Sequence, residues 1–214
     1  MLRWHILSLM VIPARDAQLV QIRDSQLLQR MDAALAEAAE RAGSWLVCKA
    51  GCTQCCHGAF AINALDAARL QTGLQALRAV DPEAVQAMQE RAQAWLAEFG
   101  AGFPGDPATG ILGTSEEDQA RFDDFANEAP CPALNPATGL CDVYAWRPMT
   151  CRVFGPPTRP AENDPLACCE LCFDGATDAQ IAACEMPVPH ALEDELVAAM
   201  GDSGETVVAF ALLR

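Results

Sequence analysis

Cysteine is the residue type whose number and spacing in this chain could do chemistry. The 214 residues include 11 cysteines, and Cys48, Cys52, Cys55 and Cys56 lie within one short segment. Thiolates are soft ligands that favour zinc and iron–sulfur clusters over magnesium or calcium. A loop that turns these side chains inward could bind one metal ion or cluster, and the neighbouring glycines supply backbone freedom. Single cysteines are common in apolar cores, but ligation explains four together better.

Two further cysteine groups follow along the chain. Cys131, Cys141 and Cys151 are evenly spaced, with a predicted turn at 135–139 between the first two. Cys168, Cys169 and Cys172 come after a proline-rich stretch, and Cys184 stands alone. A tetrahedral site takes four thiolates. The first two groups together have seven cysteines, which is more than one such site needs and one fewer than two sites need. Either some of these cysteines are not ligands, or the third group contributes.

One enzyme class shares the spacing of the first group. Cys48-x3-Cys52-x2-Cys55 matches the cluster loop of radical S-adenosylmethionine enzymes. That loop follows the first strand of a β/α barrel and usually carries an aromatic residue before its third cysteine. Here a predicted helix precedes the loop, Gln54 holds the aromatic position, and no regular alternation of strands and helices follows. The context therefore disfavours this class.

The residues around the cysteines carry a family resemblance. Cys131-Pro132 and Cys141-x2-Tyr144-x2-Arg147-Pro148-x2-Cys151-Arg152-x-Phe154 follow the first group. Over Val47 to Phe154 the chain resembles the YkgJ-like cysteine-cluster family of the CxxCxxCC type, although three residues, where the family often has two, separate Cys48 from Cys52. Its members are described as chelators of zinc or iron, or as iron–sulfur proteins.

The resemblance implies a ligand set and a cofactor. The metal ligands would be Cys48, Cys52, Cys55, Cys56, Cys131, Cys141 and Cys151. The cofactor would be an iron–sulfur cluster or zinc, and no catalytic residue is indicated. Flagellin lysine N-methylases carry a related cysteine region, which suggests a protein-modifying enzyme as one possible role.

Three other residues near the cysteines have open interpretations. Arg147 and Arg152 flank Cys151, and their charges could compensate thiolates or form buried salt bridges, for example with Asp142. His57 abuts the first group and is either a zinc ligand or an ordinary loop residue.

The elements that must position the cysteines are predicted to be helices. Apolar residues recur at helical spacing from Arg15 to Ala42. Capping patterns predict further helix starts at Asn63, Asp81, Ser115 and Thr177. A helix is also expected over 191–200, and residues 206–213 are either a terminal strand or a packed tail. The fold class is mainly α, with irregular cysteine-rich metal-binding loops between helices and little regular sheet.

The expected organisation is one domain over residues 1–214. Residues 47–154 form its cysteine-cluster metal-binding core, and residues 1–46 supply an N-terminal helix that packs on it. Residues 155–214 are a C-terminal extension with the extra cysteines.

Charge and composition restrict the partners. The chain has 14 Lys and Arg against 29 Asp and Glu, a formal net charge of −15. This acidic balance disfavours nucleic acid, and no apolar run is long enough for a membrane span. Met1 to Ala14 has some features of a signal peptide, but the apolar run is short and carries a single Arg. We therefore expect a cytoplasmic protein with reduced thiols.

Three functions remain in competition. The first is a cytoplasmic metal-binding protein whose clustered cysteines chelate an iron–sulfur cluster or zinc. The second is a metal-dependent protein-modifying enzyme, which needs an open coordination position and a substrate pocket. The third is a metal-delivery or interaction module that binds a protein partner. The sequence contains no glycine-rich nucleotide loop, His-Glu-x-x-His helix or serine-nucleophile motif.

Overall fold

The computed structural model describes residues 14–161, 164–201 and 204–214. The apolar segment weighed as a signal peptide, apart from Ala14, lies outside the described residues. The described helices are α1 (Ala14–Ala42), α2 (Ala64–Val80), α3 (Pro82–Phe99), α4 (Glu116–Asp123), α5 (Met149–Arg152), α6 (Asp178–Ala183), α7 (His190–Met200) and α8 (Val208–Ala211). Short 3-10 helices are η1 (Gly43–Trp45), η2 (Gln54–Cys56), η3 (Gly100–Gly102) and η4 (Tyr144–Trp146).

The helices begin at the capping residues that the sequence predicts. The Asn63 side chain accepts a hydrogen bond from the backbone N–H of Asp66 at the start of α2. Asp81 caps α3 in the same way, with Pro82 in its first turn. Ser115 caps α4, and Thr177 forms a full capping box at α6. These side chains satisfy backbone donors that have no partner inside the helix.

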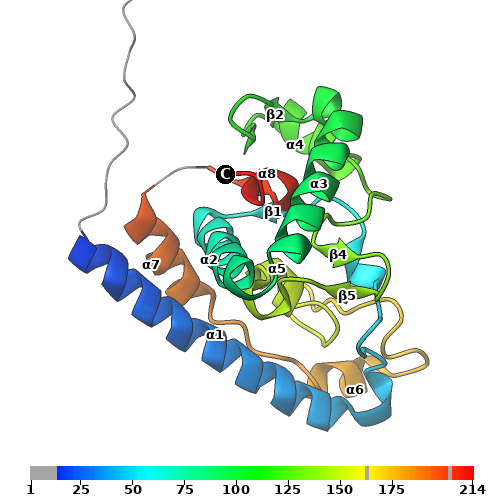
Figure 1. Cartoon of the computed structure of the whole chain (residues 1–214). Helices are drawn as coiled ribbons and strands as arrows, with labels where there is room; N and C mark the ends of the chain where they lie inside the picture. The colour runs from blue at the N-terminus through cyan, green and yellow to red at the C-terminus, as the bar shows by residue number, and fades with distance from the viewer. Residues whose placement is uncertain (1–13, 162–163, 202–203) are drawn as a thin grey trace, which may run out of the picture.

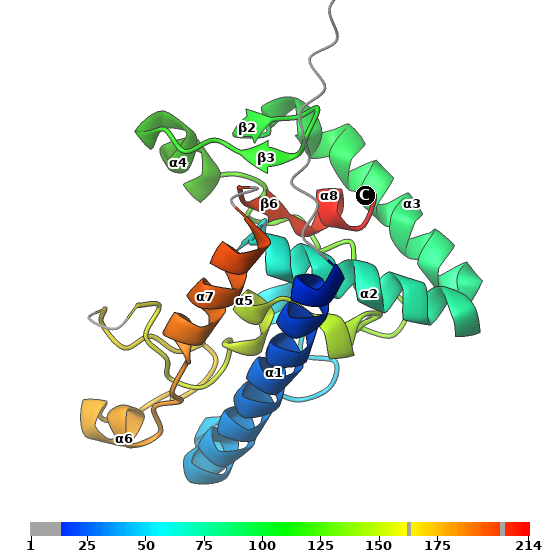
Figure 2. The same cartoon turned by 90° about the vertical axis from the view of Figure 1, so that its left-hand side faces the viewer.

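The long helix α1 lies along one side of the molecule. It packs on α7 and on the short helix α5, and Figure 1 shows α6 near its C-terminal end. Its partners in the turned view of Figure 2 are again α7 and α5. The helices α2 and α3 pack on each other and on α8, and α2 also contacts α7 and η4. Helix α2 therefore connects the α1–α7 pair with α3 and α8.

The sheet content is small, as predicted. The described residues contain three antiparallel two-stranded pairs: β1 (Ala61–Ile62) with β6 (Thr206–Val207), β2 (Gly105–Asp106) with β3 (Ile111–Leu112), and β4 (Leu134–Asn135) with β5 (Leu140–Cys141). The segment over 206–213 begins as β6 and continues as α8. The mainly α fold class is therefore confirmed.

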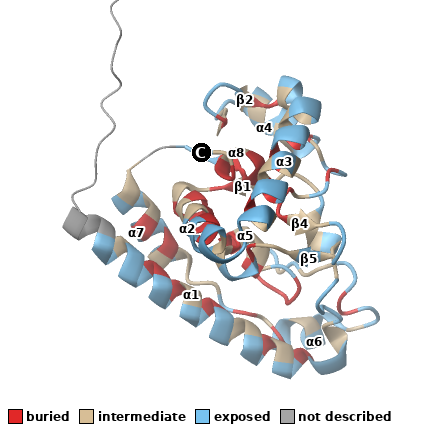
Figure 3. Cartoon of the chain, viewed as in Figure 1, coloured by how far each residue is buried: buried red, intermediate tan, exposed pale blue. Residues whose placement is uncertain are grey.

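The apolar core follows the helix faces. On α1, Leu27, Met31 and Ala38 are buried and belong to a cluster that includes Leu196 of α7. A second cluster joins α2, α3 and α8 and includes Leu70, Leu74, Val85, Met88 and Leu212. Figure 3 shows buried positions on α1, α2 and α7. These clusters hold the helices from which the cysteine-bearing loops emerge.

Among the described helices, none combines the length and the apolarity that crossing a bilayer requires.

Candidate metal centre

The first cysteine loop emerges from the C-terminal end of α1. The loop turns at Cys52, whose N–H donates to the carbonyl of Lys49 at 3.0 Å, and Gly51 adopts a positive φ of 84° there. Left-handed backbone of this kind favours glycine because it has no Cβ. The chain then forms η2, which contains Cys55 and Cys56. The turn and η2 therefore give the four thiols different directions.

The second half of this loop docks on the segment that leads to Cys131. The backbone N–H of Cys131 donates to the carbonyl of Cys56 at 2.8 Å, and Gly58 donates to Ala129 at 2.9 Å. An isolated antiparallel bridge joins the intervening residues, His57 and Pro130. Backbone contacts thus place Cys56 beside a cysteine 75 positions later in the sequence.

The β4–β5 hairpin carries the next cysteine. Its register places Leu134 opposite Cys141. The Arg91 side chain of α3 donates to the carbonyl of Pro132 at 2.8 Å and forms a salt bridge of 2.6 Å with Asp142. Because Pro132 precedes the hairpin and Asp142 follows it, Arg91 holds both of its limbs against α3.

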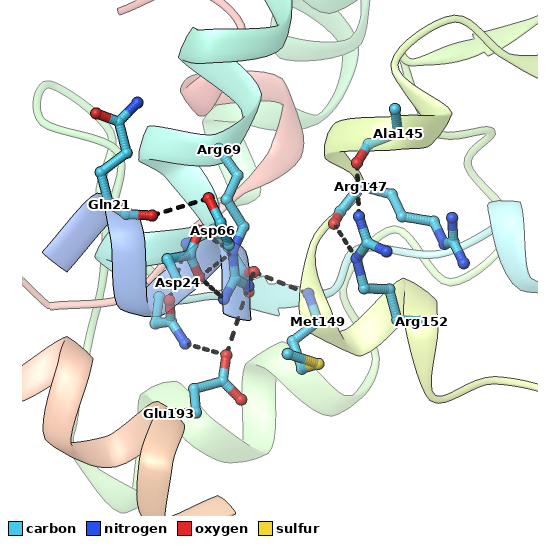
Figure 4. Close-up of polar contacts among 11 residues, drawn as sticks. Gln21, Asp24, Asp66, Arg69, Ala145, Arg147, Met149, Arg152 and Glu193 are labelled. Carbon is cyan, nitrogen blue, oxygen red and sulfur yellow. Dashed lines mark hydrogen bonds and ion pairs between the residues drawn. The ribbon is translucent and has the colours of Figure 1, made fainter. Parts of the chain in front are cut away.

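Cys151 lies on α5, whose start is fixed by α2. The backbone N–H of Met149 donates to Asp66 at 2.8 Å, so this carboxylate caps a helix from a different part of the chain. Asp66 also accepts a hydrogen bond of 2.5 Å from Arg69 (Figure 4). Burial raises the pKa of Asp66, while the charge of Arg69 counteracts this effect. A buried ionic network therefore positions the helix that bears Cys151.

The two arginines beside Cys151 have different environments. Arg152 is buried and forms a 2.6 Å salt bridge with Asp32 of α1. It also donates to the carbonyl of Ala145 at 2.6 Å (Figure 4). Arg147 lies over the ring of the exposed Tyr144, with 3.9 Å between its guanidinium carbon and the ring centroid. Arg152 thus fits the salt-bridge interpretation, although its partner is not Asp142.

Five cysteines form what we call the hairpin group: Cys55, Cys56, Cys131, Cys141 and Cys151. The Cys56 thiol donates a hydrogen bond to Cys55 and lowers the pKa of Cys55 to about 6, with a smaller contribution from the charge of Arg147. The same bond, followed by burial, raises the pKa of Cys56. Cys131 and Cys141 raise it further.

The other thiols of the hairpin group are held neutral by burial. Burial raises the pKa of Cys131 to about 12 and raises the pKa of Cys141. The pKa of Cys151 is well above its ordinary value, first through burial and then through Cys131 and Cys141. A metal ion ligated here would replace these protons and supply the positive charge that the buried thiolates lack.

The remaining two cysteines of the first loop interact with the third cysteine group of the sequence. Cys48 Sγ lies 3.8 Å from Cys172 Sγ. Burial, and then the charge of Cys172, raise the pKa of Cys48 to about 12, with smaller contributions from Cys169 and Cys52. We call Cys48, Cys52, Cys168, Cys169 and Cys172 the terminal group.

The structure therefore divides the seven candidate ligands of the sequence between two groups. It gathers Cys55, Cys56, Cys131, Cys141 and Cys151, and places Cys48 and Cys52 with the third cysteine group of the sequence. The sequence leaves open whether Cys168, Cys169 and Cys172 are ligands. The signal for their involvement is that the seven other cysteines fill neither one nor two tetrahedral sites. His57 is exposed and its Nδ1 contacts the Thr53 carbonyl at 3.0 Å.

A cavity of about 650 Å³ adjoins both parts of the first loop. Its lining includes all five thiols of the hairpin group together with Cys48 and Cys52. Tyr144, Arg147 and Phe154 also line it. The hairpin group is thus accessible from a largely apolar hollow whose lining also includes the cations Lys49, Arg147 and Arg152.

The donor set fits a thiolate-bound metal, whereas its present geometry is open. In the described parts of the chain, no three Cys, His, Asp or Glu side chains already converge closely enough to enclose a metal ion. Ligation would require rotation of thiol side chains about their χ1 bonds. Thiol donors favour zinc or iron–sulfur clusters over hard cations such as magnesium and calcium.

Comparisons with known proteins support this chemistry. The model of the CxxCxxCC family, described as a putative zinc- or iron-chelating domain, matches residues 47–173. The match spans more than half of the chain, and it extends past Phe154 to include the third cysteine group. No curated protein and no solved structure matches the chain. On the strength of the family match, the chain belongs to the CxxCxxCC family of zinc- or iron-chelating domains.

Proposed function

We propose that this chain is a cytoplasmic protein that binds zinc or an iron–sulfur cluster through its hairpin group. The observation that carries the proposal is the convergence of five thiols from three separate segments on one cavity. Such convergence brings no advantage to ordinary core packing, for which one apolar residue per position suffices. It does provide the soft donor set that zinc and iron–sulfur clusters need.

The residues that would hold the metal are drawn from the hairpin group. Cys56 and Cys131 are fixed by the backbone hydrogen bond between them, and Cys141 is fixed by the hairpin register. Cys55 has the lowest pKa of the group, so it is the thiol most ready to lose its proton. Arg147 lowers the pKa of Cys55 and Cys141 and so favours the thiolate form of both. When bound, the metal would join three chain segments and add folding free energy.

The test is an anaerobic purification followed by metal analysis, acid-labile sulfide determination and visible spectroscopy on one sample. Iron with matching sulfide and a broad thiolate-to-iron absorption would identify a cluster. A colourless protein with zinc would identify a zinc site. Absence of both metals, from protein expressed with both supplied, would contradict the proposal.

Variants identify the ligands in the same experiment. Cys55→Ser, Cys131→Ser and Cys151→Ser should each lower the metal content. Cys184→Ser is the matched control, because Cys184 is buried but packs in an apolar cluster with Ala42 and Phe173. Equal metal content in all four variants would contradict the hairpin group as the ligand set.

A second candidate function is a metal-dependent protein-modifying enzyme. The observation that favours it is the cavity, which brings the exposed Tyr144 and Arg147 next to the thiols. A pocket beside a metal with an open coordination position is what such an enzyme requires. Five protein thiols filling every metal position would count against it, and an exchangeable non-protein ligand would favour it. A delivery role predicts instead that bound metal passes readily to a competing chelator.

A further inference from the structure

The terminal group is a cysteine cluster that the proposed function does not use. Ten of the eleven cysteines belong to either the hairpin group or the terminal group, and the two share no member. In the terminal group, the distance from Cys48 Sγ to Cys172 Sγ is 3.8 Å. Two sulfurs bound to one tetrahedral zinc at about 2.3 Å are separated by roughly 3.8 Å. A disulfide needs about 2.05 Å, so the two thiols are in hydrogen-bond contact at a spacing that also suits two ligands of one ion.

Two tight turns present the thiols of this group. In Cys169-x2-Cys172, the N–H of Cys172 donates to the carbonyl of Cys169 at 2.8 Å. In Cys48-x3-Cys52, the N–H of Cys52 donates to the carbonyl of Lys49 at 3.0 Å. The turn at 169–172 has a cysteine at each end, whereas the other turn runs from Lys49 to Cys52 and is directly preceded by Cys48. The two segments together supply four thiol donors, which is the number that a closed tetrahedral site takes.

Contacts outside the cysteines hold the two turns together. The N–H of Phe173 donates to the carbonyl of Trp45 at 2.9 Å, which fixes the second turn to the end of η1. The Gln54 side chain donates to Glu170 at 2.6 Å, directly between the two loops. The turns are therefore positioned by the fold, independently of any bond between sulfurs.

Gly155 leaves room for the sulfur of Cys48. A Cβ at this position would lie 3.0 Å from Cys48 Sγ, and the backbone has a positive φ of 113°. The carbonyl of Gly155 also accepts a hydrogen bond of 3.3 Å from the N–H of Cys169. One glycine thus allows close approach of the first turn and anchors the second.

The choice between the adjacent Cys168 and Cys169 follows from their neighbours. Cys169 has a side-chain hydrogen bond with Cys172 and interacts with Cys52. Among the thiols of the described residues, Cys172 is the one that acts on Cys168. Cys169 thus interacts with a thiol of each turn, whereas Cys168 interacts with Cys172 alone among these thiols, so Cys169 is the better candidate for the fourth ligand.

We propose that Cys48, Cys52, Cys169 and Cys172 form a second, closed tetrahedral thiolate site for a zinc-type divalent ion, separate from the hairpin group. Each of the four thiols gives up its proton on ligation, and no oxidation or reduction takes place. The site goes beyond the proposed function because it uses none of the same cysteines. Its physical role is to close the loop between the end of α1 and the turn at 169–172.

The experiment titrates the reduced, metal-free full chain with Zn²⁺ under anaerobic conditions. Wild-type protein should bind two equivalents, and the double variant Cys48→Ser/Cys172→Ser should bind one. The double variant Cys56→Ser/Cys131→Ser should also bind one, at the terminal group. Cys168→Ser is the matched control, since it removes the neighbour of a proposed ligand, and it should still bind two.

The outcomes separate this proposal from the proposed function. One equivalent in wild type that is lost only in Cys56→Ser/Cys131→Ser overturns the second site and leaves the hairpin group intact. One equivalent lost only in Cys48→Ser/Cys172→Ser supports the second site and contradicts the proposed function for zinc. Loss of an equivalent in Cys168→Ser overturns the choice of ligands, and no binding in wild type overturns both proposals.

A second measurement needs no variant and therefore does not depend on variant folding. Wild-type protein with two equivalents of Zn²⁺ is treated with an alkylating reagent, and the modified cysteines are located by mass spectrometry. Protection of Cys48, Cys52, Cys169 and Cys172, with Cys168 modified, is the expected result. Modification of Cys48 and Cys172 at the metal-free rate overturns the second site.

Discussion

Arg69 is a buried cation that faces three carboxylates from three helices. Its buried guanidinium forms salt bridges with Asp24 and Asp66 at 2.5 Å each, and a longer one of 3.6 Å with Glu193 (Figure 4). The cation thus connects α1, α2 and α7. Removing the cation alone would leave three carboxylates close together with little access to water.

We predict that Arg69→Met destabilises the protein strongly. Breaking a buried ion pair by removing one partner costs about 3–5 kcal/mol. The control is Arg23→Met, which removes the exposed α1–α7 salt bridge between Arg23 and Glu195 and should cost about 1 kcal/mol or less. Urea unfolding of both metal-free variants gives the comparison. Similar losses in the two variants would show that burial of Arg69 carries no special energy.

The same network predicts how stability responds to pH. Burial raises the pKa of Glu193 in the folded chain, with a further contribution from Asp66. The native state therefore binds this proton more readily than the unfolded state, and the free energy of unfolding rises as pH falls toward the ordinary Glu pKa of about 4.3. Glu193→Gln removes this titration.

As the pH is lowered from 7 to about 4.5, the free energy of unfolding of wild type should thus increase relative to that of Glu193→Gln. Urea unfolding of both proteins at a series of pH values measures this difference. A difference that is constant, or that decreases as the pH is lowered, would be inconsistent with the raised pKa.

Among the secondary-structure elements, α5 and the β4–β5 hairpin, which carry Cys151 and Cys141, are each fixed by a helix that bears no cysteine. Helix α2 caps α5 through Asp66, and α3 holds the β4–β5 hairpin through Arg91. The helices were predictable because their caps and apolar periodicity are local signals. The contacts that Asp66 and Arg91 make with these elements were not predictable, because nothing near either residue in the sequence identifies its partner.

Arg91→Met should loosen the β4–β5 hairpin. The change removes a 2.8 Å bond to the Pro132 carbonyl and the salt bridge with Asp142. Hydrogen bonds to charged groups contribute about 1.5–3 kcal/mol, so amide exchange at Asp142, whose N–H donates to Ala133, should accelerate roughly tenfold or more. Arg121→Met on α4 is the control and should leave exchange at Asp142 unchanged. Unchanged exchange in Arg91→Met would show that the hairpin is held by other contacts.

At the scale of the whole molecule, helices form the frame and the cysteine-bearing loops close over it. The core clusters of α1 with α7 and of α2 with α3 and α8 consist mainly of apolar helix residues. The loops over 46–58 and 155–172 contain no α-helix among their described residues. Metal should therefore matter more to the loops than to the helices.

Acid or a strong chelator should release the metal and loosen these loops while most of the helical signal remains. Limited proteolysis of metal-loaded and metal-free protein should show new early cleavage near Cys48 and near 155–172. Restoring metal at neutral pH is the control and should restore resistance. Equal protease resistance with and without metal would contradict a role for metal in ordering the loops.

The mainly α fold, the starts of the capped helices and the soft-donor chemistry of the chain are predictable from local sequence pattern and residue type. Which thiols meet depends on tertiary contacts. Cys52 and Cys55 are three residues apart, yet Cys52 lies with Cys169 and Cys55 with Cys56, Cys141 and Cys151. The physical reason is that the turn at Gly51 and the docking of Cys56 on Cys131 direct the two halves of the loop to partners far away in sequence, which spacing does not encode.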